Sequence, residues 1–340
     1  LDAERGKVDR DGVDEVRGYK GAFKRYLKGL KECVNDDVSD KDAINMLAQQ
    51  VVTKPIFEKL FGGEGFTFEN SVSQTIDEML SEINVKDGLR EMEEELQNFY
   101  NSVDMTLTKI DTAEGRQKVI TSLYEKFFKN AFPKDQAING VVYTPIAVVD
   151  FILRSAADIL EAELGMDISS PGVNILDPFT GTGTFIARLM ETGIIRKEDL
   201  EYKYRNELFA NEITLLAYYI AVVNIENTYA KILETDEYAR FDNILLTDTF
   251  NIKEICERKS EQTYFDEKEV FKKNKERIRR EHEAPITVIV GNPPYGGKQK
   301  SVSDDAKKRT YTDGIDKRIG ETYLDDSLFE GEKKNHQGMS

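Results

Sequence analysis

The residues best suited to chemistry are Gly-Asn-Pro-Pro-Tyr at 291–295, directly after the apolar run Ile-Thr-Val-Ile-Val. A short apolar, β-branched run predicts a buried strand, so these five residues lie where that strand ends. Asn292 and the carbonyl of Pro293 supply two hydrogen-bond acceptors, and Pro293 and Pro294 stiffen the turn because their φ angles are fixed. Tyr295 adds an aromatic ring. None of the five is an acid, a general base or a strong nucleophile.

These groups suit chemistry on the exocyclic amine of a purine, a poor nucleophile because its lone pair is delocalised into the ring. Two acceptors aimed at the amine hydrogens favour a tetrahedral nitrogen and localise the lone pair. The ring of Tyr295 can stack on a base drawn out of a helix, a contact worth ~1–3 kcal/mol. No base has to act before a methyl group arrives, because the proton leaves afterwards. A chain with only two histidines, His282 and His336, therefore loses nothing.

A glycine-rich loop, Leu-Asp-Pro-Phe-Thr-Gly-Thr-Gly-Thr-Phe at 176–185, is the second candidate site. Gly181 and Gly183 let backbone approach a ligand closely, and the helix that follows exposes N–H groups at its start. The loop does not match a dinucleotide-binding fingerprint, because Ile186 stands where the third glycine is required. It does not match a phosphate loop either, because no Lys-Ser/Thr pair ends it. S-adenosylmethionine is the third cofactor class. It has no phosphates and needs carboxylates for its ribose hydroxyls and adenine amine.

The sequence supplies such carboxylates at the ends of successive expected strands. Asp177 ends the strand at 173–178, Glu212 the strand at 207–213, and Asp248 the strand at 241–248. One acid at a strand end is most often a cap or a solvated turn residue. Three in succession after a glycine loop favour a cofactor site along the carboxyl edge of a sheet.

The remaining pattern divides the chain into a helical part and an alternating part. Residues 1 to about 130 read as helices, with Ser39 as an N-cap. A helix after Pro145 places four apolar residues on one face, namely Val149, Ile152, Ala156 and Ile159. Further helices are expected at 184–194, at 214–233 and within 251–283, and a last strand at 286–293. This alternation predicts an α/β fold with a parallel sheet.

Composition narrows the class of protein. The chain has 340 residues, enough for two domains, and a net charge of −16, which argues against a surface that grips nucleic acid everywhere. Basic clusters at 272–280 and 298–309 are expected near the catalytic edge, beside the 291–295 motif, although a solvated helix face is the commoner explanation of such runs. No apolar run is long enough to span a membrane, and the two cysteines give neither a disulfide framework nor a metal site. We expect no metal and a cytoplasmic setting.

The ordered motifs resemble those of amino-adenine (N6) DNA methyltransferases of the gamma class. They are Val-Tyr-Thr-Pro (142–145), Asp-Pro-Phe-Thr-Gly-Thr-Gly-Thr-Phe (177–185), Phe-Ala-Asn-Glu-Ile (209–213), Thr-Asp-Thr-Phe (247–250) and Gly-Asn-Pro-Pro-Tyr (291–295). Two helical stretches, 53–63 and 123–134, further resemble the coupler of single-chain Type ISP restriction–modification enzymes. The resemblance covers nearly the whole chain, and the full ordered set of motifs is highly specific.

The resemblance implies a Rossmann-like, S-adenosylmethionine-dependent methyltransferase fold with an incomplete sheet, preceded by an all-helical region. It implies a coupler-like region at 1–135, a methyltransferase domain at 136–295 and a polar tail at 296–340. Catalytic residues would be Asn292, Pro293, Pro294 and Tyr295. Thr144 would contact the methionine part of S-adenosylmethionine, Glu212 the ribose and Asp248 the adenine amine. The loop lining the cofactor would comprise Asp177, Pro178, Thr180, Gly181 and Gly183.

The implied substrate is double-stranded DNA with the target adenine flipped out. A nuclease, a helicase-like motor and a target-recognition domain are expected in a full-length chain of this kind. Only four strands are expected where a complete methyltransferase sheet has seven, so we expect a fragment with negligible turnover by itself. Methylation of a protein glutamine or of RNA, and a non-catalytic coupling module, are the alternative functions.

Overall fold

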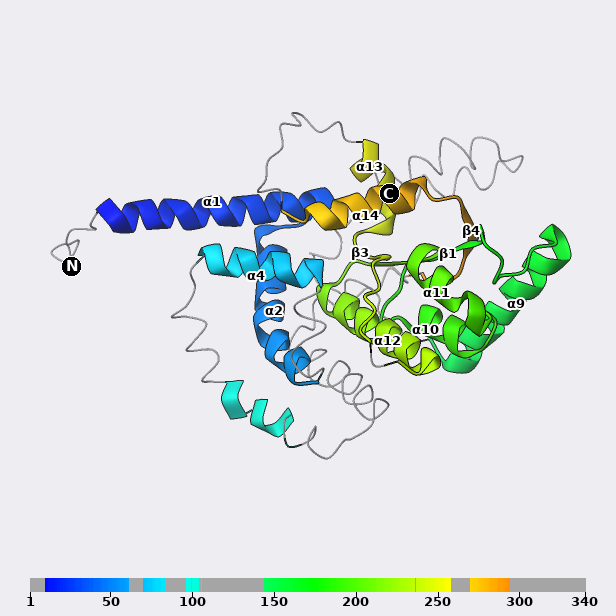
Figure 1. The fold of residues 1–340 in the computed structure, drawn as a ribbon. Coiled ribbons are helices and arrows are strands. Elements are labelled where there is room, and N and C mark those ends of the chain that lie inside the picture. Colours follow the sequence, from blue (N-terminus) through cyan, green and yellow to red (C-terminus); the bar gives the residue numbers. More distant parts are fainter. Residues whose placement is uncertain are drawn as a thin grey trace, which may run out of the picture.

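The computed structural model describes residues 10–60, 70–83, 96–98, 100–103, 105, 144–235, 237–257 and 270–293 (Figure 1). The N-terminal helices are α1 (Arg10–Cys33), α2 (Asp40–Leu60) and α4 (Ser71–Ile83). The strands are β1 (Asn174–Asp177), β2 (Leu208–Glu212), β3 (Ile244–Leu246) and β4 (Ile286–Ile289). The other helices are α9 (Ile146–Leu164), α10 (Thr184–Glu191), α11 (Lys197–Asn206), α12 (Leu215–Leu233), a 3₁₀ turn η2 (Thr249–Asn251), α13 (Ile252–Glu257) and α14 (Lys272–Glu283).

The four strands form one parallel sheet in the order β3-β2-β1-β4, which confirms the predicted α/β class. The chain moves outward from β1 through β2 to β3 and then returns to the other side of β1. Ligands of such sheets bind at the carboxyl ends of the strands, where the direction of winding reverses. That point lies here between β1 and β4. All four residues of β1 are buried, as expected for a central parallel strand covered on both faces.

Helices cover both faces of the sheet (Figure 1). Helix α12 packs on β2 and β3 and against α10, which in turn packs on α9, while α14 covers β3 from the other face. Fourteen residues of α12 are buried, including Tyr218 and Tyr219, because this helix lies between the sheet and the N-terminal helices. No helix among the described residues is long and apolar enough to cross a membrane.

The N-terminal helices pack against the sheet domain beside β3. The side chain of Asn70 donates to the hydroxyl of Tyr218 on α12 over 3.2 Å, and Arg277 on α14 donates to Ser71 over 2.7 Å. Lys275 on α14 forms an ion pair with Glu32 on α1. These contacts join the N-terminal helices to the sheet domain through α12 and α14, the helices that pack on β3.

The predicted cap of α2 is confirmed, and the predicted face of α9 is confirmed at Val149, Ile152 and Ala156 but wrong at Ile159. Ser39 caps α2, since its backbone N–H donates to Asp42 and its hydroxyl accepts from the Asp42 N–H in return. Helix α9 buries Val149, Leu153 and Leu160, whereas Ile159 is 62% exposed. The sequence pattern predicted a buried face through residues 149, 152, 156 and 159. The face packed on α10 is rotated by about one residue, toward 153 and 160.

Helix α11 had no counterpart among the predicted elements. Its sequence, Lys-Glu-Asp-Leu-Glu-Tyr-Lys-Tyr-Arg-Asn, is highly polar and buries only Leu200, Lys203 and Tyr204. Lys203 is fully buried because its ammonium donates to the carbonyls of Ser170 and Val173 and pairs with Glu207 at 2.6 Å. A lysine used as a core residue leaves no apolar period in the sequence for pattern analysis to find.

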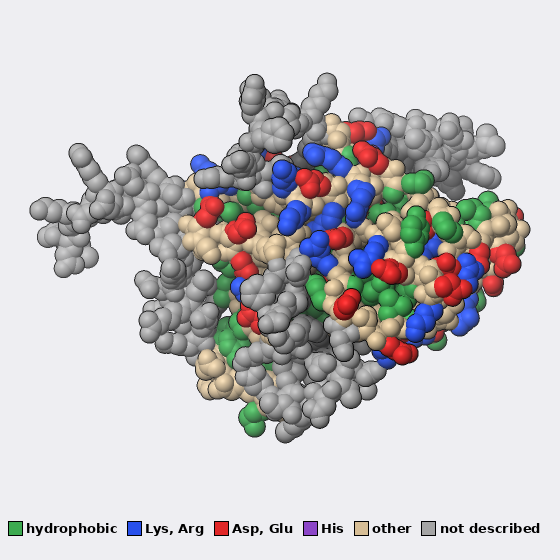
Figure 2. All heavy atoms as spheres, in the orientation of Figure 1, with side chains coloured by type: hydrophobic (Ala, Val, Ile, Leu, Met, Phe, Trp, Pro, Cys, Tyr) green, Lys and Arg blue, Asp and Glu red, His purple; other side chains and the backbone are tan. Residues whose placement is uncertain are grey.

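The basic cluster at 272–280 spans the sheet from edge to edge, with Lys272, Lys273 and Lys275 toward the carboxyl edge. Asn274 makes two hydrogen bonds with the backbone of Leu246, at the end of β3, whereas Arg280 bonds Asn243, before β3 begins. The helix therefore runs antiparallel to the strands, and Arg279 and Arg280 lie toward the amino edge. Figure 2 shows Lys and Arg side chains gathered over this part of the surface. The cluster at 298–309 lies outside the described residues.

We predict that Gly29→Ala destabilises the protein relative to Gly21→Ala. Both glycines lie inside α1, where alanine is favoured over glycine by about 1 kcal/mol. A Cβ at position 29 would meet the Val270 Cβ at 2.8 Å, whereas at position 21 the nearest atom is 3.8 Å away, in the Arg25 side chain. Overpacking costs about 1–3 kcal/mol, so the two variants should differ by that amount in urea unfolding. Equal stabilisation by both substitutions would contradict the tight contact between α1 and Val270.

Candidate active site

The loop after β1 is held by the ends of the neighbouring strands. The hydroxyl of Thr180 donates to the Asp177 carbonyl over 3.0 Å, and its N–H donates to the Asn211 carbonyl on β2 over 2.9 Å. Gly181 has φ +56° with open space where a Cβ would project, so its backbone is accessible to a ligand. Gly183 has φ +83°, and a Cβ there would lie 3.1 Å from the Ala221 backbone. The close approach at Gly183 is therefore to helix α12.

Glu212 is buried at the end of β2 and faces this loop. One carboxylate oxygen accepts from the N–H of Gly181 over 2.9 Å, and the other accepts from the N–H and the hydroxyl of Thr214, each over 2.7 Å. Burial raises the pKa of Glu212, and the hydrogen bonds from Thr214 and Gly181 oppose that rise. The N–H of Ile213 also lowers the pKa of this carboxyl, so Glu212 is held by donors from the glycine loop and from the turn after β2.

Asp177 is fully buried at the end of β1, and its Oδ2 has no hydrogen-bond partner among the described residues. Its Oδ1 accepts from the N–H of Phe179 over 3.2 Å. Burial raises the pKa of Asp177 to about 8, the Phe179 bond opposes this, and the nearby charge of Glu212 adds to it. A buried acceptor without a donor is unusual in a folded protein and marks a place where a ligand donor or cation would be stabilising.

The Gly-Asn-Pro turn after β4 lies directly beside Asp177. The N–H of Val290 donates to the Leu176 carbonyl over 3.0 Å, which holds the end of β4 against β1. A Cβ on Gly291 would lie 2.8 Å from Oδ1 of Asp177, so only glycine fits there. Asn292 and Pro293 follow at once, half-buried and exposed respectively. The structure thus brings the predicted acceptor pair next to the glycine loop.

The turn after β3 completes the cluster. The hydroxyl of Thr249 donates to the Pro178 carbonyl over 2.6 Å, and the rings of Phe179 and Phe250 lie 5.3 Å apart. Asp248, at the start of η2, accepts from the N–H of Phe250 over 3.0 Å. The ends of β1, β2, β3 and β4 therefore meet at one edge with three buried carboxylates and two half-buried aromatic rings.

Several predicted site residues, Thr144 and Pro293 among them, have no described contact with this cluster. Thr144 lies half-buried immediately before α9, whose first backbone bonds go to Pro145. Pro294 and Tyr295 lie outside the described residues, as does the predicted tail at 296–340. Sequence reasoning in turn missed Thr249, Phe250 and Asn35, which all contact the cluster. Asn35 gave no signal because it lies 213 residues from its partner, Asp248.

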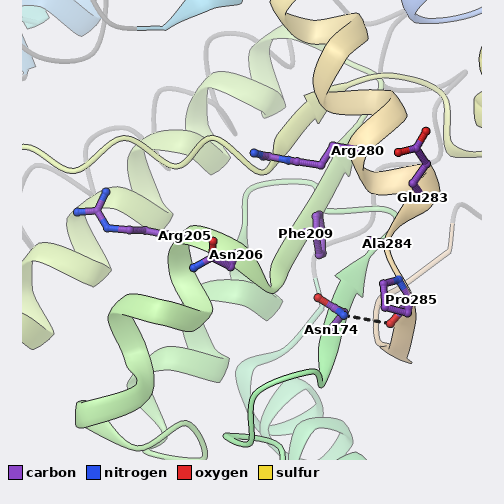
Figure 3. Close-up of a pocket in the computed structure, with 8 residues that line it drawn as sticks. All are labelled: Asn174, Arg205, Asn206, Phe209, Arg280, Glu283, Ala284 and Pro285. Carbon is purple, nitrogen blue, oxygen red and sulfur yellow. Dashed lines mark hydrogen bonds between the residues drawn. The ribbon is translucent and has the colours of Figure 1, made fainter.

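A cavity at the opposite edge of the sheet does not coincide with these residues. It has a volume of about 280 Å³ and lies where β1 and β4 begin (Figure 3). Asn174 donates across it to the Pro285 carbonyl over 3.1 Å. Because ligands of parallel sheets bind at the carboxyl ends of the strands, we assign the candidate site to the cluster and not to this cavity. The cavity is lined by Asn174, Arg205, Asn206, Phe209, Arg280, Glu283, Ala284 and Pro285.

Comparison with known sequence families decides the class. Residues 115–319, more than half of the chain, match the family described as N-6 DNA Methylase. The chain belongs to the N-6 DNA methylase family. Residues 9–115 match the coupler domain of Type ISP restriction-modification enzymes, so a coupler precedes the methylase domain, as the sequence motifs predicted. The domain boundaries at 135 and 295 stay predictions.

Solved structures show the same arrangement. "ATP-dependent Type ISP restriction-modification enzyme LlaBIII bound to DNA" is 40% identical, with a TM-score of 0.78 over 95% of this chain and 21% of that one. A nuclease-deletion mutant of the Type ISP enzyme LlaGI, in complex with a DNA substrate mimic, is 38% identical, with a TM-score of 0.78 over 96% of this chain and 27% of that one. A DrdV–DNA complex is 33% identical, with a TM-score of 0.77 over 94% and 30%. A search of curated protein sequences found no significant match.

The chain thus spans less than a third of the length of these solved relatives. The methylase domain and the coupler are the parts that it shares with them. The fold class and the helical coupler predicted from the motifs are confirmed by these comparisons and by the parallel sheet.

We predict that Asp177→Asn flattens the dependence of stability on pH. The folded methylase domain holds a proton on Asp177 up to about pH 8, whereas the unfolded chain releases it near the ordinary value of 3.8. Between these values the unfolded chain binds fewer protons, so the free energy of unfolding falls as the pH rises. Urea unfolding at about pH 5 and about pH 7.5 should show a smaller fall in the variant than in the wild type.

The fall should not vanish, because other buried carboxyls, among them Glu212, act in the same direction. Burial raises the pKa of Glu226 to about 8 and that of Glu281 to about 7. Glu226→Gln is the matched comparison, since it removes a buried carboxyl on α12 that accepts from the N–H of Phe241, and it should flatten the profile by a similar amount. Identical pH profiles for Asp177→Asn and the wild type would contradict a protonated Asp177.

Proposed function

We propose that this chain binds S-adenosylmethionine at the carboxyl edge of the sheet and serves the methylation of the exocyclic amine of adenine in DNA. One observation carries the proposal. The Gly-Asn-Pro turn after β4 lies against the buried carboxylate of Asp177, in the same cluster as Glu212 and Asp248. Membership of the N-6 DNA methylase family supports the same reaction class.

The carboxyl groups of the cluster suit S-adenosylmethionine better than they suit a dinucleotide or a nucleoside triphosphate. The cluster offers carboxylates rather than Lys or Arg side chains, and carboxylates repel phosphate. Glu212 would accept from the ribose hydroxyls and Asp248 from the adenine amine, while Gly181 leaves open space beside the loop. Asp177, whose Oδ2 lacks a donor among the described residues, would face positive charge or N–H groups of the methionine part. Thr144, Pro178, Thr180 and Gly183 would complete the lining.

The cofactor, when bound, supplies the methyl group. The protein's own part is to hold the target amine with its lone pair directed at that group. The Asn292 side-chain oxygen and the Pro293 carbonyl would accept the two amine hydrogens, because they leave the end of β4 together in a turn whose φ is fixed at proline. Tyr295 would stack on the flipped base, and Pro294 would keep the turn rigid. The proton would then leave to water, so no side chain needs to act as a base.

The substrate we propose is double-stranded DNA with the target adenine flipped out. Two of the solved relatives are Type ISP restriction-modification enzymes with DNA or a DNA substrate mimic, the third is a DrdV–DNA complex, and this chain covers a minor part of each. A nuclease, a helicase-like motor and a target-recognition domain would belong to the parts of such enzymes beyond the coupler and the methylase domain.

We predict that calorimetry detects binding of S-adenosylmethionine by this chain, and no binding of NAD or ATP. Glu212→Gln should weaken S-adenosylmethionine binding by about 1–3 kcal/mol, the usual scale for a hydrogen bond to a charged group. Gln is preferred to Ala because it keeps the volume that supports Gly181 and Thr214. Glu163→Gln, on the exposed surface of α9, is the control and should bind like the wild type. Binding of NAD without S-adenosylmethionine would reject the proposed cofactor.

We predict that Asn292→Ala, in the protein that carries this chain, lowers methyl transfer to DNA on the order of 100-fold, the scale of losing one preorganised hydrogen bond to the reacting group. The measurement is mass spectrometry of nucleosides from unmethylated DNA after incubation with labelled S-adenosylmethionine. N6-methyladenine should be the product, and cofactor binding should persist in the variant. Label found in protein or RNA instead of DNA would support the alternative substrates and overturn the proposed one.

A further inference from the structure

The C-terminal end of coupler helix α1 contacts the turn that follows β3. The hydroxyl of Thr247 donates to the carbonyl of Cys33, the last residue of α1, over 2.7 Å. The side-chain amide of Asn35 donates to Oδ2 of Asp248 over 3.0 Å. Two neighbouring residues of the β3 turn are therefore bonded to two residues at one helix end. The carbonyls at a helix C-terminus lack partners within the helix, so Thr247 satisfies one of them.

The orientation of Asn35 follows from its own turn. Its side-chain oxygen accepts from the N–H of Asp37 over 3.1 Å, which leaves the amide nitrogen to face Asp248. Val34 and Val38, on either side, are buried and fix the turn on the protein core. An Asp at position 35 would set a second carboxylate against Asp248, so the position requires a side chain that accepts at one end and donates at the other.

Asp248 is held from both domains. Its Oδ2 accepts from Asn35 in the coupler and from the side chain of Asn251 over 3.0 Å, and its Oδ1 accepts from the N–H of Phe250 over 3.0 Å. The bonds from Phe250 and Asn251 are local to the turn itself. Asn35 donates from outside the methylase domain, just after α1. The orientation of the Asp248 carboxylate therefore depends on the position of α1.

That position is tightly defined by packing. Gly29 lies so close to α14 that a Cβ would meet Val270, and the rings of Tyr26 and Phe271 lie 5.9 Å apart. The ion pair between Glu32 and Lys275 lies one turn further along. Helix α1 is thus seated on α14 over its last two turns, and a shift of the helix would carry Asn35 away from Asp248.

We propose that Asn35 is a positioning residue for the adenine end of the cofactor site, and that through it the seating of coupler helix α1 sets the affinity for the cofactor's adenine. The inference rests on the proposed function, in which Asp248 accepts from the adenine amine. Hydrogen bonds from Asn35 and Asn251 hold Oδ2, so they fix the plane in which the carboxylate meets a ligand amine. Loss of the Asn35 bond frees the carboxylate to turn and costs the fixed acceptor geometry.

Docking of α1 and binding of the cofactor are thermodynamically linked, which gives a second prediction. If the docked α1 raises the affinity for the cofactor, the bound cofactor must stabilise the docked α1 by the same factor. Amides in the turn between α1 and α2 should then exchange with solvent more slowly when ligand is bound. Val34, whose N–H donates to the Leu30 carbonyl over 2.7 Å, reports on the end of the helix.

The test compares two ligands that differ only at the purine 6-position. S-adenosylhomocysteine carries an amine there, and its deaminated analogue, with unsubstituted purine in place of adenine, carries only a carbon-bound hydrogen, which gives Asp248 no N–H to accept from. Calorimetry on the 340-residue chain should show that the wild type prefers the amine. Asn35→Ala should lower that preference about tenfold, the scale of one hydrogen bond to a charged group. Asp37→Ala is the control, because only its backbone N–H bonds Asn35 and its side chain is exposed.

The outcomes separate the two proposals. A wild type that binds neither ligand would overturn the proposed function. A wild type that binds both equally would overturn the contact between Asp248 and the amine and, with it, the positioning role. An Asn35→Ala variant that keeps the full preference, or loses both affinities equally, would overturn the positioning role alone. If Asn35→Ala fails to fold, hydrogen exchange of the wild type at residues 30–38 decides. Slower exchange with S-adenosylhomocysteine supports the coupling, and unchanged exchange overturns it.

Discussion

The parallel pairing of β1 between β2 and β4 is the constraint on which the rest of the structure depends. β1 is central and wholly buried, and its register with both neighbours brings the ends of the strands to one edge. Residues as far apart in sequence as Asp177 and Gly291 touch only because of that pairing. The glycine loop, the carboxylates and the Gly-Asn-Pro turn each have little chemical meaning alone, and the sheet makes them one site.

The same edge carries a cost that a ligand would relieve. Asp177 and Glu212 are both buried, and burial raises the pKa of each because the charged form loses its water. Folding gains little from burying these two carboxyl groups at one edge, and their burial supports the proposal that a ligand binds there. The coupler also contributes to this edge. Thr247 donates to Cys33 at the end of α1, and Asn35, just after that helix, donates to Asp248.

Much of this could be read from the sequence, and the limits have physical causes. Strands, their parallel order and the carboxylates at their ends were predictable because apolar runs and strand-end residues are local signals. The buried face of α9 could be predicted only in part, because contact with α10 decides which apolar residues are buried, and Ile159 stays exposed. Helix α11 was invisible because it buries a lysine, Lys203, in place of an apolar side chain. The Asn35–Asp248 bond has no local signature at all.

The most direct test of the account is a crystal structure of this chain grown with S-adenosylhomocysteine. The account predicts electron density at the carboxyl edge of the sheet, with the ribose at Glu212, the adenine amine at Asp248 and the sulfur end toward Asp177 and the Gly291–Pro293 turn. Density instead in the cavity at the amino edge, between Asn174 and Arg280, would contradict the assignment of the site. So would an adenine ring bound at the carboxyl edge with its amine turned away from Asp248.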